Sequence, residues 1–528
     1  MDTSLREMPV GIQDFEKLRT EGCVYVDKTQ FAYALTRISR PFFLSRPRRF
    51  GKSLFISTLK AYFLGKKHLF EGLAIAELEK DWIEYPVIYI DFNMVSIDCM
   101  QSMEIMLNAI LEDYESEWGI TEKHGLLSAR FYKLIKTAYE KSGRKVVVLV
   151  DEYDKALVNT IDNPKIHQEL TTFFKSFYGV LKSMDYALRF IFLTGVSKFA
   201  QVSIFSDLNQ LIDISLYDQY AEICGISETE LLEQFQPELH ALAKKTGMTY
   251  DETVAKLKKL YDGYRFASEG ANMYNPFSLL NTFMQNKYAY YWFRTGTPTF
   301  LTHTLQKSRF DIRKLENDIT IQIKKIDEYR VDETSLMPLL FQTGYLTIKS
   351  YNAKRDAFRL GYPNEEVKYG FLDELLPAFI PKWELDDSFS IMTFMDALDS
   401  GEVEDFMNLL RAYYAAIPYD LEDNRDKDEK YYQLICYLLF TNMGQFVDTE
   451  VKSSRGRADV VVKTADSIYV FEFKMEENAS AEEALAQIDK TGYLIPYTAD
   501  HRRLVKIGVE FSTEERGIKR WLADIVEN

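Results

Sequence analysis

Apolar and polar residues alternate near the C-terminus with the period of two that predicts β-strands. Two such segments, 458–463 and 468–474, flank the polar residues 464–467. Pairing of Lys463 with Ile468 would close a hairpin around that turn. The side chains of one face are then apolar and anchor the hairpin in a core: Val460, Val462, Tyr469, Phe471 and Phe473.

The other face of this predicted hairpin carries charged residues. In the antiparallel register that starts at Lys463, Asp459 lies opposite Glu472, and the period of two places Lys474 on the same face. Two carboxylates supply the oxygen ligands that hold Mg²⁺, and a lysine orients or deprotonates an attacking water. The pattern therefore predicts metal-assisted hydrolysis of a phosphodiester, with a hairpin of solvated charges as the alternative.

Helical patterns on both sides of the hairpin extend this picture. Glu429 opens an apolar helix that continues to Phe440, and Gln487 lies in a helical segment that continues to Tyr493. In this order the segments resemble the PD-(D/E)XK nuclease superfamily, whose pattern is an Asp on one strand and Glu-x-Lys on the next. The resemblance implies that Glu429 is an additional acidic residue near the metal and that Gln487 belongs to the active site. No proline precedes Asp459, at a position that varies widely in the superfamily.

The N-terminal half contains a strand, a loop and a helix in succession. Residues 41–44 are strand-like, 45–50 are loop-like, and Gly51-Lys52-Ser53 opens an amphipathic helix. This context predicts a P-loop, in which backbone N–H groups hold phosphates, Lys52 reaches the β- and γ-phosphates, and Ser53 ligates Mg²⁺. Arg46 stands where the first Gly of such a loop belongs. The predicted nucleotide contacts of the loop are Arg46, Arg48, Arg49, Phe50, Gly51, Lys52, Ser53 and Leu54.

The segment 145–152 contains a continuous apolar run that ends in Asp151 and Glu152, as a buried parallel strand with a Walker B terminus does. Asp151 is predicted to hold Mg²⁺ through water, and Glu152 to orient the hydrolytic water. Thr194 ends another strand-like run, where AAA-type ATPases keep a sensor for the γ-phosphate. With a further strand at 87–91, the pattern predicts a doubly wound α/β domain that binds ATP and Mg²⁺.

Four segments make a family resemblance specific: 11–15, 25–29, 43–53 and 205–209. They resemble the bacterial AAA-ATPase-like family that carries a PD-(D/E)XK domain at its C-terminus, and the resemblance spans nearly the whole chain. Because that family shows the same arginine-rich loop, the resemblance implies that Arg46 is its normal residue at this position.

The predicted fold class is α/β, in four parts. Residues 1–225 form a P-loop AAA-like domain with a parallel sheet, 226–300 a helical lid, 301–400 a connecting α+β or winged-helix-like module, and 401–528 an α/β PD-(D/E)XK nuclease-like domain. The aromatic turn at 291–298 is interpreted as packing.

Composition indicates what class of protein this is and in which cellular compartment we expect it. The chain has 528 residues, of which 46% are hydrophobic, so it is expected to fold into several globular domains. Its start lacks the apolar core of a signal peptide, and no apolar run approaches the roughly 20 residues of a membrane span. We therefore expect a cytoplasmic protein without membrane contact. Four cysteines without Cys-x-x-Cys spacing argue against zinc and against disulfides.

The net charge of −16 limits how nucleic acid can be bound. A protein this acidic is expected to contact nucleic acid only through local basic patches. Two candidate patches flank the hairpin, the first made of Lys452, Arg455 and Arg457 and the second of Arg502, Arg503 and Lys506.

These patterns together predict an ATP-hydrolysing protein whose nucleotide state controls a Mg²⁺-dependent nuclease. The alternative is a nucleotide-dependent switch whose nuclease-like domain only binds nucleic acid or a protein. The presence of Asp459, Glu472 and Lys474 favours the nuclease, because a domain that had lost its nuclease activity would be free to lose these residues. A third hypothesis, a motor that translocates nucleic acid, requires a homo-oligomer and an arginine finger that the sequence alone does not assign.

Overall fold

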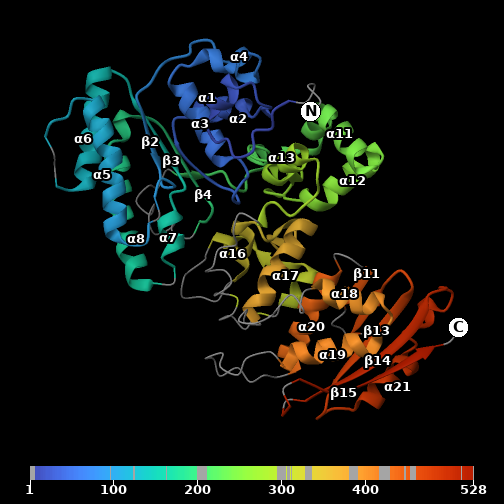
Figure 1. Cartoon of the computed structure of the whole chain (residues 1–528). Helices are drawn as coiled ribbons and strands as arrows, with labels where there is room; N and C mark the ends of the chain where they lie inside the picture. The colour runs from blue at the N-terminus through green and yellow to red at the C-terminus, as the bar shows by residue number, and fades with distance from the viewer. Residues whose placement is uncertain are drawn as a thin grey trace. The chain divides into compact units, whose positions relative to one another are not determined.

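The chain folds into two compact units. Unit 1 comprises Met1–Thr304 and Asn317–Val367, and unit 2 comprises Leu305–Glu316 and Lys368–Asn528 (Figure 1). The computed structural model describes residues 6–95, 97–122, 125–161, 163–198, 211–293, 305, 310, 312–327, 336–379, 391–415, 429–444, 448–451, 459–512, 514–515 and 517–526.

Unit 1 is built on a five-stranded parallel sheet with the order β2-β3-β4-β1-β5. Its strands are β1 (Pro41–Ser45), β2 (Val87–Asp91), β3 (Val146–Asp151), β4 (Leu188–Gly195) and β5 (Ile212–Asp213). Every residue of β3 is buried, as expected for an apolar strand covered on both faces. The predicted parallel α/β sheet is confirmed.

Helices cover both faces of this sheet (Figure 1). Ile191 and Leu193 of β4 belong to a core shared with α5 (Met100–Glu117), α6 (Leu127–Ser142) and α8 (Pro164–Ser183). Phe192, on the opposite side of the same strand, packs against Phe55 of α3 (Lys52–Phe63) with ring centroids 5.7 Å apart. Further helices on the α3 side are α1 (Phe15–Thr20), α2 (Thr29–Thr36) and α4 (Ala74–Leu78).

A helical segment follows the sheet. It comprises α10 (Glu228–Gln234), α11 (Gln236–Thr246), α12 (Tyr250–Tyr261) and α13 (Pro276–Gln285), with the short pair β6 (Ile226–Ser227) and β7 (Met273–Tyr274). Ser227 and Glu230 form a capping box at the start of α10, in which each side chain accepts the other's backbone N–H. We call this segment the lid.

The predicted connecting module, 301–400, is divided between the two units. Within unit 1 it supplies an antiparallel sheet with the order β8-β10-β9, together with α15 (Ile323–Asp327) and α16 (Leu336–Thr343). The strands are β8 (Ile319–Gln322), β9 (Thr347–Asn352) and β10 (Ala357–Gly361). α17 (Glu365–Phe379) begins at the end of unit 1, and its residues from Lys368 onward belong to unit 2.

Unit 2 is built on a five-stranded mixed sheet with the order β11-β12-β13-β14-β15. Its strands are β11 (Asp448–Val451), β12 (Val460–Lys463), β13 (Ser467–Met475), β14 (Arg503–Ser512) and β15 (Gly517–Val526). Lys463 pairs with Ile468, so the predicted hairpin register is confirmed. β13 and β14 run parallel and are joined through α21 (Ala481–Thr491), and the remaining helices are α18 (Ile391–Asp399), α19 (Val403–Ala415) and α20 (Glu429–Met443).

The hairpin of unit 2 is covered on both faces, whereas the sequence pattern indicated a core on one face only. Phe471 packs against Phe406 of α19 and Phe440 of α20. On the opposite face, Val470 shares a core with Ile488 of α21. The crossover helix α21 covers this second face of the hairpin. The charged residues of that face are therefore more buried than the alternation of the sequence suggests.

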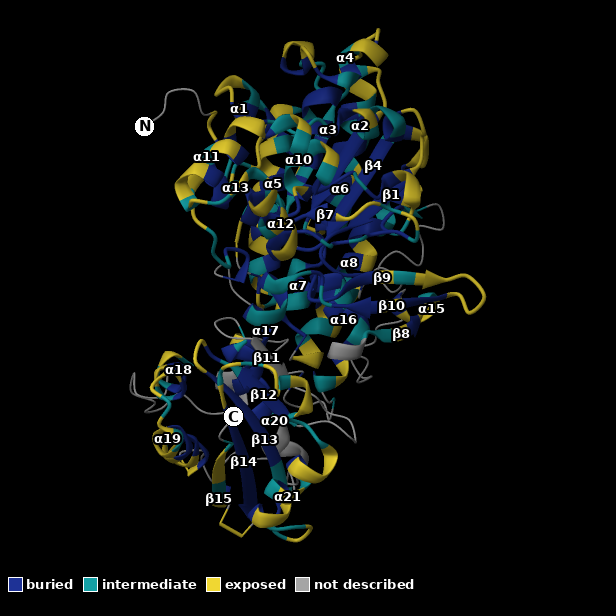
Figure 2. Ribbon diagram, turned by 90° about the vertical axis from the view of Figure 1, so that its right-hand side faces the viewer, coloured by how far each residue is buried: buried dark blue, intermediate teal, exposed yellow. Residues whose placement is uncertain are grey.

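Figure 2 shows β1, β4 and β13 largely in the colour of buried residues. Within the described ranges, no helix has both the length and the apolarity needed to cross a membrane. The cysteines Cys23, Cys99, Cys224 and Cys436 are all free thiols.

Candidate functional sites

The predicted P-loop forms a tight turn between β1 and α3. Gly51 precedes the helix with φ 95°, a left-handed conformation that glycine adopts without a steric penalty, and Arg49 has φ 68°. Lys52 is only 3% exposed, and its Nζ donates to the carbonyls of Arg46 and Pro47 at 3.0 and 3.2 Å. The turn therefore folds around the ammonium group that is predicted to bind phosphates.

Asp151 ends β3 and is completely buried. Its Oδ1 accepts a hydrogen bond from the Thr194 hydroxyl, whereas its Oδ2 is buried and has no hydrogen-bond donor among the described residues. Burial, reinforced by the neighbouring Glu152, raises the pKa of Asp151 to about 6, and the Ser53 and Thr194 hydroxyls oppose this rise. A buried carboxylate oxygen without a donor, next to a P-loop serine, fits a Mg²⁺ ligand.

Glu152 lies where the catalytic glutamate was predicted. Its Oε1 lies 3.2 Å from Lys52 Nζ, and its side chain is 15% exposed. Its φ of 51° is uncommon for a non-glycine residue, and such strain tends to be retained at functional sites. The carboxylate and the ammonium group therefore lie together at the end of the strand.

Asp154 is a buried acid that the sequence reasoning missed. Its carboxylate accepts from Ser197 N and Oγ, both at 2.6 Å, and from Val196 N at 3.2 Å, and burial raises its pKa to about 6. Gly195 leaves room for it, since a Cβ there would lie 2.7 Å from the Tyr153 ring and closer still to Asp154 Oδ1. Asp154 thus connects the end of β3 to the segment after β4. The third acid in four residues was the available signal.

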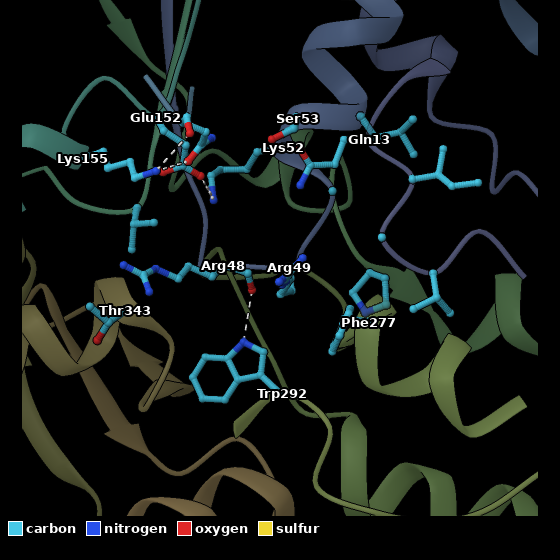
Figure 3. Close-up of a pocket in the computed structure, with 18 of the residues that line it drawn as sticks. Gln13, Arg48, Arg49, Lys52, Ser53, Glu152, Lys155, Phe277, Trp292 and Thr343 are labelled. Carbon is cyan, nitrogen blue, oxygen red and sulfur yellow. Dashed lines mark hydrogen bonds and ion pairs between the residues drawn. The ribbon is translucent and has the colours of Figure 1, made fainter. Parts of the chain in front are cut away.

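A pocket of about 500 Å³ opens beside the P-loop (Figure 3). Its walls come from the segment before α1, the P-loop, the ends of the parallel strands, the lid, the residues 292–293 that follow it, and the end of α16 with the turn after it. The predicted site residues that line it are Arg48, Arg49, Gly51, Lys52, Ser53, Leu54 and Glu152.

Two predicted contacts of the loop lie elsewhere. The Arg46 guanidinium is buried and donates to the carbonyls of Ser45, Ser215 and Tyr220, and burial lowers its pKa to about 10. Phe50 is also buried, with its ring 4.6 Å from that of Tyr264. The side chains of Arg46 and Phe50 therefore brace the loop from behind and do not face the pocket.

The predicted connecting module contributes to this pocket. Thr343 and Tyr345 line its wall, and Gly344 between them packs so tightly that a Cβ would lie 2.7 Å from the Pro47 side chain. Trp292, interpreted from the sequence as packing, donates from Nε1 to the Arg48 carbonyl at 3.2 Å. No local pattern signals these contacts, because they join segments that are far apart in the chain.

The hairpin of unit 2 brings its predicted residues together. Glu472 Oε1 accepts from Lys474 Nζ at 2.9 Å and from Gln487 Nε2, while Asp459 Oδ2 accepts from Phe473 N at 2.9 Å. Glu472 is 2% exposed, and its Oε2 is buried without a hydrogen-bond donor among the described residues. Burial raises the pKa of Glu472, and Lys474, the Asp459 backbone and Gln487 oppose that rise.

Gly508 explains how Gln487 reaches Glu472, and the sequence reasoning missed it. It pairs with Glu472 across the parallel β13–β14 ladder. A Cβ at this position would lie 2.8 Å from Leu485 N and closer still to the carbonyl oxygen of Ala481. Only a glycine therefore lets α21 pack this closely against the strands.

Several other predicted residues have limited descriptions. Glu429 begins α20, but its side chain and the residues 452–458, which include the first basic patch, lie outside the described part of the chain. In the second patch, Arg502 pairs with Asp500 at 2.7 Å. The other two cations there are also engaged, Lys506 by Asp489 and Asp524, and Arg503 by the Gly401 carbonyl.

The described residues contain no group of three or more His, Cys, Asp or Glu side chains that could hold a metal by themselves. Mg²⁺ does not need such a group, because it usually keeps several waters and is bound by one or two carboxylates together with substrate phosphates.

Comparison with known proteins matches two family models to the chain. One, described as a predicted AAA-ATPase, matches residues 9–205, and the other, described as the PD-(D/E)XK nuclease superfamily, matches residues 427–521. The uncharacterized protein in the vnfD 5' region of Azotobacter chroococcum mcd 1 is 37% identical over 525 residues, which cover 98% of each chain.

Among solved structures, the Aeropyrum pernix ORC2 protein in ADPNP-ADP complexes is similar with 11% identity and a TM-score of 0.25. The match covers 74% of this chain and 94% of that chain. A likeness at this level carries no argument about fold or function.

Proposed function

Because the chain belongs to the family of bacterial proteins that join a predicted AAA-ATPase domain to a C-terminal PD-(D/E)XK nuclease superfamily domain, we propose that it hydrolyses ATP and that its nucleotide state controls a Mg²⁺-dependent nuclease. One observation carries the proposal. In each unit a buried carboxylate has one oxygen bonded to a protein donor and one without a donor among the described residues, namely Asp151 Oδ2 and Glu472 Oε2. Leaving such an oxygen unsatisfied costs about 1–3 kcal/mol, so each site suits a cation.

In unit 1 the roles follow from position. Ser53 and Asp151 are the residues that would hold Mg²⁺, which neutralises charge on the β- and γ-phosphate oxygens when bound. Lys52 binds the same phosphates as a point charge. Glu152 orients the attacking water and accepts its proton, and Thr194 fixes the orientation of the Asp151 carboxylate.

In unit 2 the substrate is nucleic acid. Asp459 and Glu472 are the residues that would hold Mg²⁺, which stabilises the charge of a phosphodiester under attack when bound. Lys474 orients the attacking water from its position 2.9 Å from Glu472 Oε1. Gln487 holds the Glu472 carboxylate in place through its side-chain amide.

The ATPase assignment is tested with two variants that separate binding from hydrolysis. Lys52→Ala removes a charge that contacts phosphate, so it should weaken ATP binding measured by calorimetry. Glu152→Gln removes the group that positions water, so it should bind ATP normally but hydrolyse it slowly. Equal ATP affinity in the wild type and in Lys52→Ala would contradict the P-loop assignment.

The nuclease assignment is tested by Mg²⁺-dependent cleavage of DNA and RNA. Lys474→Ala and Glu472→Gln should each abolish cleavage, and the double variant should be scarcely worse, because residues that act as one site are not additive. Lys519→Ala is a matched control, since this lysine of the same unit pairs with Glu476 outside the site. Nucleic-acid binding without cleavage by the wild type would favour the alternative, a nucleotide-dependent switch.

Control by the nucleotide is tested in the Glu152→Gln protein, which should keep ATP bound. Its cleavage rate is compared with ATP, with ADP and without nucleotide, at fixed free Mg²⁺ because ATP chelates the metal. A tenfold difference requires only about 1.4 kcal/mol of differential affinity for two conformations. Identical rates in all three conditions would show that the two activities are independent.

A further inference from the structure

The arginine-rich loop places three arginines in three different surroundings. Arg46 is buried and donates to backbone carbonyls behind the loop. Arg49 is exposed, and its guanidinium lies 4.8 Å from the centre of the Phe277 ring, at the start of α13 of the lid. Arg48 is exposed and lines the pocket. Among the described residues, no carboxylate pairs with Arg48.

The cations around the pocket are engaged to different degrees. Lys52 pairs with Glu152 at 3.2 Å. Lys155 donates to the Asn93 side chain at 3.0 Å. In the view of Figure 3, the Arg48 side chain extends toward the same side of the pocket as Lys155. Arg48 is therefore a cation that lines the pocket and that no carboxylate in the described part of the chain neutralises.

The backbone that carries Arg48 is held in place from several directions. Trp292 Nε1 donates to the Arg48 carbonyl, and the preceding residue, Pro47, lies tightly against Gly344. The Arg46 guanidinium fixes the loop from behind through its hydrogen bonds to carbonyls. A charge on a rigid loop needs no reorganisation when negative charge develops beside it, and this is the condition under which electrostatic catalysis is strongest.

We propose that Arg48 contacts the terminal phosphate of bound ATP and stabilises the charge that develops on it during hydrolysis. The inference rests on the proposed ATPase function and adds a catalytic residue to it. Water attacks the γ-phosphorus, the bond to the bridging oxygen breaks, ADP leaves with that electron pair, and Glu152 accepts the proton of the water. Arg48 donates hydrogen bonds throughout and exchanges no proton.

The position of this arginine has a consequence for assembly. P-loop enzymes obtain such a charge either from their own chain or from a partner protein. Arg48 belongs to the same loop that holds the phosphates, so the chain supplies the charge itself. Hydrolysis should then proceed without an arginine from a second copy.

The experiment compares Arg48→Ala and Arg48→Lys with Arg355→Ala, which removes an exposed arginine from the turn between β9 and β10 of the same unit. ATP affinity is measured by calorimetry and hydrolysis in single turnovers. Arg48→Ala should lower the rate about 100- to 1,000-fold and change Kd by less than about threefold, because the contact strengthens in the transition state. The hydrolysis rate of Arg48→Lys should lie between those of the wild type and Arg48→Ala, and the rate of Arg355→Ala should equal that of the wild type.

Mixing variants tests whether Arg48 acts within its own chain. Arg48→Ala protein keeps an intact phosphate site, whereas Lys52→Ala protein keeps Arg48 but binds ATP poorly. A mixture should hydrolyse no faster than Arg48→Ala protein alone. Recovery of activity would show that the arginine acts on a neighbouring copy and would overturn the inference.

The remaining outcomes separate this inference from the proposed function. If the wild type hydrolyses ATP but no faster than Arg48→Ala protein, the role of Arg48 is overturned and the proposed ATPase function stands. The same follows if Arg48→Ala changes only the Kd for ATP and not the rate of hydrolysis. A wild type that binds no ATP would overturn the proposed function and this role together. Thermal unfolding of each variant confirms that it is folded, as expected for the replacement of an exposed side chain.

Discussion

Replacement of Asp151 by asparagine should stabilise the protein in the absence of Mg²⁺ and nucleotide. The carboxylate is completely buried, and one of its oxygens has no donor among the described residues. Ionisation at neutral pH therefore places a charge where solvation is poor. An amide of nearly the same shape removes that charge and still accepts the hydrogen bond from Thr194.

The size of the effect follows from the pKa of Asp151. Burial raises this pKa from its ordinary value of 3.8 to about 6 in the folded chain. The folded state therefore binds the proton more tightly than the unfolded state, so the stability of the wild type falls as pH rises from about 4 to 6. At about 1.4 kcal/mol per pKa unit, the loss is at most about 3 kcal/mol. We expect Asp151→Asn to recover about 1–3 kcal/mol at pH 7 and above.

The assay is differential scanning calorimetry of the full chain between pH 4 and pH 8, in chelator. The melting temperature of Asp151→Asn minus that of the wild type should be smallest near pH 4 and reach a few degrees at pH 8. Asp91→Asn is the matched control, because Asp91 ends the neighbouring strand but is only half-buried. A variant less stable than the wild type at pH 8, or a difference that does not change with pH, would refute the reasoning.

Three further substitutions test packing and positioning. Gly508→Ala should cost about 1–3 kcal/mol in urea unfolding and reduce cleavage, because a Cβ would push α21 away from β14; normal stability and cleavage would contradict this. Trp292→Phe removes the donor to the Arg48 carbonyl, so kcat for ATP should fall about tenfold with little change in Kd; an unchanged kcat would deny the positioning role. Arg46→Met should leave the Ser215 and Tyr220 carbonyls unsatisfied and lower the melting temperature. An unchanged melting temperature with weaker ATP binding would show instead that the guanidinium binds phosphate and does not brace the loop.

Sequence patterns predicted the elements that depend on neighbouring residues. The hairpin register around Lys463 and Ile468 follows from the period of two and a short polar turn. The continuous apolar run predicted the buried strand β3 and also its end at Asp151. In each case the information lies within a few residues of chain.

The contacts that the patterns did not predict join distant segments. Trp292 meets Arg48, and Gly508 meets α21, only after the chain has folded. The direction of the Arg46 side chain likewise depends on carbonyls that lie far along the chain from it. Alternation specifies which side of a strand a residue occupies, but it does not show which helix will cover that side.

The two units are not consecutive in the sequence. The chain leaves unit 1 after Thr304, returns to it at Asn317, and leaves it again after Val367, so it passes between the units three times. No single cut of the chain therefore separates the two complete units from each other. A fragment that begins at Lys368 lacks Leu305–Glu316, and one that ends at Thr304 lacks the pocket-lining residues Thr343 and Tyr345. A single proteolytic cut at any of the three crossings would leave at least one unit with residues in both pieces. The two pieces are therefore expected to remain associated.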